Sequence, residues 1–155
     1  MAPQAENRPG FTVKIIALWS VFLFGTIFHT QLGLIPLFHG LDVLAAHGHV
    51  ATDISEISMI LWLMLGFFML PLVAIIALCF FTSRKFRVGH FWLTVFYSIM
   101  NLAHLVVDLT IQPIAWYQIA LMAFLFVNGL ILNVVAYQWV REVRWHRHHR
   151  LESVG

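Results

Sequence analysis

The chain has 155 residues, of which 61% are hydrophobic and 10% are charged, and its net charge is +2. Because a soluble domain carries about 25% charged residues, this composition excludes a separate soluble domain and indicates an integral membrane protein. The single cysteine, Cys79, excludes an intrachain disulfide and a CxxC site.

Four apolar stretches follow one another, and each is long enough to cross the hydrocarbon core of a bilayer. We predict membrane spans over residues 11–38, 57–81, 91–111 and 115–140. The first is too long for a signal peptide and has no A-x-A site after it. The short connections favour an all-α, four-helix transmembrane bundle with up-down-up-down topology, forming a single domain over residues 1–155.

The basic residues lie in three segments: the N-terminal arm with the start of the first span, the second connection, and the tail 141–155. The loop 39–56 and the third connection have none. The positive-inside rule therefore predicts that both termini are cytoplasmic, in a bacterial inner membrane or an equivalent one. We expect the basic tail to contact anionic headgroups rather than nucleic acid.

One polar stripe lies inside the third span. Asn101, His104 and Asp108 follow i, i+3, i+7 spacing, so on a helix all three side chains point the same way. Such a stripe is costly when it faces lipid. We therefore expect it to face protein, water or a cofactor.

The first span carries a matching histidine. His29 lies 15 residues after Lys14, and His104 lies 14 residues after His90, so the two histidines should lie at similar depth in the outward half. Small residues near His29 would let a flat ligand approach closely. The pattern predicts haem b between the first and third spans. The predicted haem-binding residues are His29 and His104 as axial ligands, Thr26 and Asn101 beside them, and Gly25 and Gly33 as space for the macrocycle.

The resulting hypothesis is a small membrane b-type cytochrome, or a cytochrome subunit, that transfers single electrons at the outward side. The layout is similar to that of four-helix membrane b-type cytochromes, although no motif specifies that family. A redox partner would then be required, and Asp108 would serve as a hydrogen-bond or proton partner.

A second hypothesis places a transition metal at the outer face. Imidazole and carboxylate side chains are ligands for Zn, Cu or Fe, and the outward loop holds several of them. The predicted metal-binding residues are His39, His47, His49, His104 and Asp108. An interfacial polar loop is the simpler interpretation of the same segment, and Asp53 with Glu56 resembles a capping box for the second span.

A third hypothesis is a structural or assembly subunit of a larger membrane complex, or a homo-oligomer, without any cofactor. Polar residues such as Asn128 and Asn133 would then hydrogen-bond between helices. The sequence has no Gly-rich phosphate loop and no Ser-His-Asp arrangement, and whether the chain is an enzyme stays open.

Overall fold

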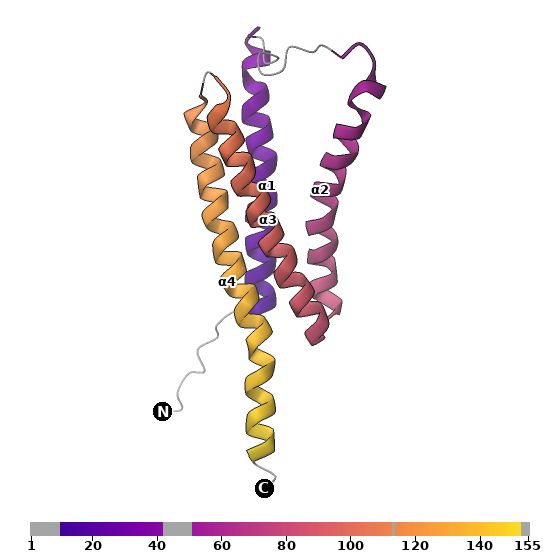
Figure 1. Ribbon diagram of the computed structural model, residues 1–155, viewed down its shortest axis with the longest axis vertical. Helices are drawn as coiled ribbons and strands as arrows, with labels where there is room; N and C mark the ends of the chain where they lie inside the picture. Colours follow the sequence, from indigo (N-terminus) through magenta and orange to yellow (C-terminus); the bar gives the residue numbers. More distant parts are fainter. Residues whose placement is uncertain (1–9, 42–50, 113, 153–155) are drawn as a thin grey trace, which may run out of the picture.

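The computed structural model describes residues 10–41, 51–112 and 114–152, with side chains to residue 142. These residues form four α-helices: α1 (Phe11–Phe38), α2 (Ile54–Phe80), α3 (Arg84–Thr110) and α4 (Trp116–Glu152). All four are long and apolar enough to cross a membrane. Consecutive helices run in opposite directions (Figure 1). The predicted all-α class with four membrane-spanning helices is therefore confirmed.

Two helices begin earlier than the predicted spans because polar side chains cap them. The Asp53 carboxylate accepts a hydrogen bond of 2.7 Å from the Ser55 backbone N–H, and α2 begins at Ile54 rather than at 57. The Ser83 hydroxyl accepts one from the Phe86 N–H at 3.3 Å, and α3 begins at Arg84 rather than at 91. Each cap satisfies a backbone donor that the first helical turn leaves free.

The four helices are packed unevenly along their length. α4 lies against both α1 and α3, while α2 contacts α1. The buried core gathers in the half of the bundle where α1 and α3 begin, around the Trp19 indole. Its members are Ile15, Trp19, Phe22, Leu78, Tyr97, Leu132 and Trp139. The opposite half is more open, and there α2 diverges from the other helices (Figure 1).

Pro71 interrupts the hydrogen bonding of α2, and α3 compensates for it. Proline has no backbone N–H, so the carbonyl four residues earlier, that of Phe67, loses its helical donor. The Tyr97 hydroxyl donates to this carbonyl oxygen at 2.6 Å. A backbone group left free in lipid is costly, so this bond both repairs α2 and ties it to α3.

Side-chain hydrogen bonds also join the other helices. The Trp19 indole N–H donates to His90 Nε2 at 3.1 Å, joining α1 to α3. The Asn128 amide donates to the Leu18 carbonyl at 3.1 Å, joining α4 to α1. The Arg87 guanidinium pairs with Glu142 at 2.9 Å, joining α3 to α4. These bonds fix the positions of α1 and α3 relative to each other and to α4.

We expect Tyr97→Phe to lower the free energy of unfolding by about 1–3 kcal/mol, because the Phe67 carbonyl would be left without a donor. Pro71→Ala restores a helical N–H for that carbonyl, so Tyr97→Phe should cost less in the Pro71→Ala background. Unfolding of the four proteins of this cycle in detergent measures the coupling. Tyr117→Phe, at an exposed position of α4, is the control. If Tyr97→Phe lowers the free energy of unfolding equally with Pro71 and with Ala at that position, the Tyr97 hydroxyl does not compensate for the proline.

The start of α2 should depend on pH. Hydrogen bonds from the Ser55 side chain and backbone lower the pKa of Asp53 below its usual 3.8. A lowered pKa in the folded state stabilises the helix start above pH 3.8, and this contribution disappears as the pH falls through the lower folded value. The hydrogen-exchange protection factors of the first-turn amides, which already correct for the intrinsic pH dependence of exchange, should therefore fall at acidic pH. Asp53→Asn keeps the acceptor without titrating, and it should lack the effect.

Candidate metal centre

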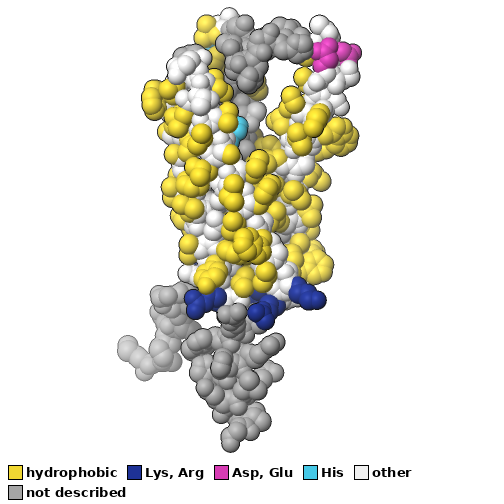
Figure 2. Space-filling view, viewed as in Figure 1, with side chains coloured by type: hydrophobic (Ala, Val, Ile, Leu, Met, Phe, Trp, Pro, Cys, Tyr) yellow, Lys and Arg dark blue, Asp and Glu magenta, His cyan; other side chains and the backbone are white. Residues whose placement is uncertain are grey.

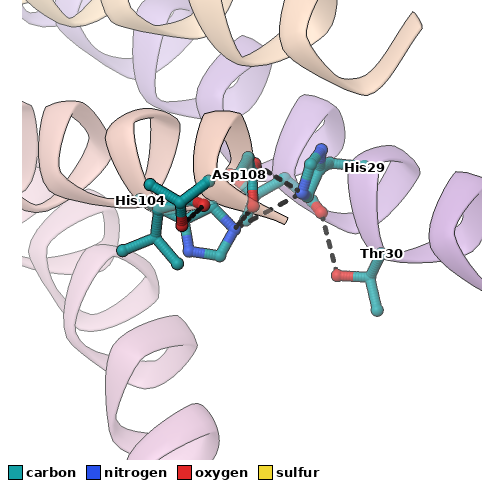
Figure 3. Close-up of polar contacts among 7 residues, drawn as sticks. His29, Thr30, His104 and Asp108 are labelled. Carbon is teal, nitrogen blue, oxygen red and sulfur yellow. Dashed lines mark hydrogen bonds and ion pairs between the residues drawn. The ribbon is translucent and has the colours of Figure 1, made fainter. Parts of the chain in front are cut away.

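Three side chains from two helices converge in the open half of the bundle (Figure 3). His29 projects from α1, and His104 and Asp108 lie one turn apart on α3. The two Nε2 atoms are 3.4 Å apart. His29 Nε2 is 3.5 Å from Asp108 Oδ2, and His104 Nε2 is 3.5 Å from Asp108 Oδ1. The group therefore offers two imidazole nitrogens and a carboxylate within reach of a common centre.

Burial differs among the three side chains. The side chains of His29 and Asp108 are 11% and 16% exposed, whereas that of His104 is 54% exposed. His29 Nδ1 and Asp108 Oδ2 are buried, and neither has a hydrogen-bond partner among the described residues. Buried polar atoms without partners are uncommon and costly in native proteins. Two members of the group are thus mostly buried and hold polar atoms without hydrogen-bond partners among the described residues, whereas the third is exposed.

The separations are long for hydrogen bonds between the three groups, and they also suit ligands of one ion. Hydrogen bonds with an N–H donor have lengths of about 2.7–3.2 Å, shorter than the 3.4–3.5 Å found here. Two ligands bound to zinc at about 2.05 Å with a tetrahedral angle lie about 3.4 Å apart. Ligands at a right angle, as in an octahedral site, would lie about 3.0 Å apart. The distance between the two Nε2 atoms therefore matches that of two ligands of a tetrahedral ion. Each imidazole faces a different carboxylate oxygen, so a rotation of Asp108 would bring one oxygen to both.

The two histidines face each other as the sequence predicted, but their separation is small for haem. Imidazole–metal bonds of about 2.0 Å put two nitrogens on opposite sides of an iron about 4 Å apart, with the porphyrin between them. The observed Nε2 distance is 3.4 Å, and the ring centroids are 5.3 Å apart. Haem ligation stays a prediction, and it would require α1 and α3 to move apart.

The structure corrects the predicted positions of the two glycines. A Cβ added to Gly25 would lie 2.3 Å from Leu125 Cδ2, and one added to Gly33 would lie 3.0 Å from Gln118 Nε2. Both partners belong to α4. The small residues therefore admit a neighbouring helix, and neither glycine lines the space beside the histidines.

Thr26 and Asn101 border a cavity that residues of all four helices line. The Thr26 hydroxyl donates to the Phe22 carbonyl at 2.8 Å within α1. The cavity has a volume of about 480 Å³, and both histidines of the candidate site lie on its wall. Figure 2 shows the hollow beside α2, with a histidine side chain visible in it.

The predicted metal set is only partly brought together. His104 and Asp108 join His29, which the sequence assigned to haem alone. His39 follows the end of α1, ten residues beyond His29, or about 15 Å along the helix. His47 and His49 lie outside the described residues. The matched depth of His29 and His104, combined with the i, i+4 pair His104–Asp108, was the signal that could have identified the three-residue group.

Comparisons with protein-family models, with curated proteins and with solved structures found no match. The fold and the site thus define the class: a four-helix protein with membrane-spanning helices and a His-His-Asp group between α1 and α3. Its role is inferred below from this chain's own geometry.

Because Gly25 lies against α4, we expect a larger side chain at this position to destabilise the fold. Gly25→Ala should destabilise the protein by about 1–3 kcal/mol, because the Cβ would overlap the buried Leu125 side chain. Gly66→Ala is a matched control in α2, since no atom lies within 4 Å of its added Cβ. Thermal unfolding in detergent measures both variants. Equal stability of the two would show that α1 and α4 are not in close contact at this point.

Proposed function

We propose that this chain is an integral membrane protein that binds one transition metal ion through His29, His104 and Asp108. The observation that carries the proposal is the mutual spacing of the three side chains, 3.4–3.5 Å. Two imidazoles and one carboxylate are a ligand set for zinc, copper or iron, and the tetrahedral spacing favours zinc.

The open coordination position gives such a site its chemistry. A tetrahedral ion with three protein ligands keeps a fourth position for water or another small ligand. A bound divalent ion acts there as a Lewis acid. Asp108 supplies one negative charge beside the two neutral rings, which offsets half the charge of the ion. The exposed edge of His104 is the side from which another ligand reaches the site.

The charge distribution supports an outward position for this metal site. The described Lys and Arg side chains gather at one end of the bundle, where Glu142 pairs with Arg87, whereas acidic side chains at the start of α2 lie at the other end (Figure 2). The positive-inside rule assigns the basic end to the cytoplasm. Both termini would then be cytoplasmic. The site lies in the half remote from the basic end, near the C-terminal end of α3.

Metal analysis of the purified full-length chain tests the proposal. After chelator treatment and titration with Zn²⁺, we expect one bound ion per chain by calorimetry and elemental analysis. His29→Ala, His104→Ala and Asp108→Ala should each weaken binding by about 100-fold or more, since removing even an outer-shell partner costs about 10–100-fold. His39→Ala, an exposed histidine of α1's C-terminal end, is the matched control and should bind normally.

The controls separate the three hypotheses. Zinc binding that survives His29→Ala but is lost in His39→Ala would overturn the assignment. A Soret absorbance that disappears in both His29→Ala and His104→Ala would instead establish haem ligation. Stable, correctly folded protein that takes up neither metal nor haem would favour the structural-subunit hypothesis.

A further inference from the structure

The cavity beside the metal site has the size and lining of a small-molecule site. Its volume is about 480 Å³, and residues of all four helices line it. Pockets of about 300–1,000 Å³ with apolar walls and a few polar groups are typical of ligand sites. Aromatic rings stack against flat molecules, and methionine side chains adapt to irregular ones. The large apolar lining residues are Phe22, Met64, Phe67, Phe68, Met100 and Met122.

The Asn101 amide is an unused hydrogen-bond donor on the wall of this cavity. Asn101 is 4% exposed, and its Nδ2 is the accessible polar atom of the side chain, because its Oδ1 is buried. The side chain makes no hydrogen bond with any residue that the structure describes. A polar group without a partner is costly inside a bilayer. An acceptor on a bound molecule would therefore stabilise the Asn101 amide.

The polar groups on the wall select a molecule that accepts a hydrogen bond. Thr26 donates to the Phe22 carbonyl and Thr30 donates to the Thr26 carbonyl, so neither hydroxyl hydrogen is available to a ligand. The Asn101 Nδ2 can donate but cannot accept. A carbonyl oxygen matches this donor, because it accepts a hydrogen bond and brings no donor that needs a further partner.

The depth of Asn101 separates a free carbonyl compound from a phospholipid. Tyr97 is the middle residue of α3, and Asn101 lies about 6 Å beyond it along the helix. With α3 centred in the bilayer, the hydrocarbon core ends about 15 Å from that middle residue. Phospholipid ester carbonyls lie outside this core, too far from the centre to meet the Asn101 amide. A carbonyl compound that dissolves within the core can reach it.

The cavity also borders the apolar surface of the bundle. Met64 of α2 and Met100 and Val107 of α3 line the cavity, and all three are exposed side chains of helices long and apolar enough to cross a membrane. A lipid-soluble molecule therefore meets the cavity beside the surface that contacts lipid.

We propose that this cavity binds a membrane quinone, one of whose carbonyl oxygens accepts a hydrogen bond from the Asn101 amide. A quinone combines a flat ring, solubility in the hydrocarbon core and a carbonyl oxygen. The proposal goes beyond the metal site, since Asn101 is not a member of the His29–His104–Asp108 group.

Native mass spectrometry of the full-length, chelator-treated protein tests this proposal. The probes are decyl-benzoquinone and decylbenzene, which carries the same tail on a ring without oxygens. We expect one quinone per chain. Asn101→Leu removes the donor and should weaken quinone binding about 10-fold, the effect of one hydrogen bond, while leaving decylbenzene binding unchanged. Because the two probes are compared in the same two proteins, their different partitioning into detergent cancels.

A second pair of variants locates the bound molecule. Ala103→Phe places a large side chain at an exposed lining position and should abolish quinone binding. Ala120→Phe, exposed on α4 and outside the cavity, is the matched control and should bind normally. Thermal unfolding checks that each variant is folded.

The proposal is overturned if the quinone does not bind, if Asn101→Leu changes the affinities of both probes equally or changes neither, or if Ala103→Phe binds quinone as well as Ala120→Phe. A phospholipid that co-purifies, identified by its mass, and that quinone does not displace would also overturn it. Failure of the metal site is a separate result, because it concerns Zn²⁺ uptake in His29→Ala.

Discussion

Polar groups inside a bilayer must find partners within the protein, and this constraint accounts for the side-chain hydrogen bonds between the helices. In the packed half of the bundle, several side chains meet this requirement. The Tyr97 hydroxyl satisfies the carbonyl released by Pro71, and the Trp19 indole is paired with His90. These bonds set the relative positions of α1, α2 and α3, on which the geometry of the other half depends.

In the open half, the chain leaves the same requirement unmet. His29 Nδ1, Asn101 Oδ1 and Asp108 Oδ2 are buried without hydrogen-bond partners among the residues the structure describes, although Asp108 Oδ2 lies 3.5 Å from His29 Nε2. Asn133 Oδ1 is a further such atom, although the amide nitrogen of Asn133 bonds Ser98 at 2.9 Å. Two of these atoms belong to His29 and Asp108, the side chains that converge with His104 in the candidate metal centre.

The two proposals place different demands on the same region. The metal site uses ring nitrogens and a carboxylate that face one another between α1 and α3, with His104 at its exposed edge. The cavity lies beside it, and its walls are mostly apolar and include residues of α2. An ion bound by His29 and His104 would therefore border the pocket. This proximity means that an occupant of the cavity would lie close to the open coordination position.

Much of the architecture followed from the sequence alone. The four long apolar runs predicted the four helices, because an uncharged apolar stretch of about 20 residues is long enough to cross the hydrocarbon core as a helix. Helical periodicity determined that His104 and Asp108 share a face, and counting residues along two spans determined the similar depth of His29 and His104. Those relations are local or periodic, so a sequence can express them. The sequence also suggested that Asn128 and Asn133 would hydrogen-bond between helices. The Asn128 amide donates to the Leu18 carbonyl of α1, and the Asn133 amide donates to the Ser98 hydroxyl of α3.

Only the tertiary structure decided which groups meet. Gly25 and Gly33 were predicted to make room for a ligand, but the rotation of α1 turns them toward α4. His29 was predicted as a haem ligand and Asp108 as part of an outer metal set, yet the approach of α1 to α3 joins them in one group. The cavity depends on the divergence of α2 from its neighbours (Figure 1). Rotation, approach and divergence of helices arise from packing between residues distant in the chain, and no periodicity within a single helix encodes them.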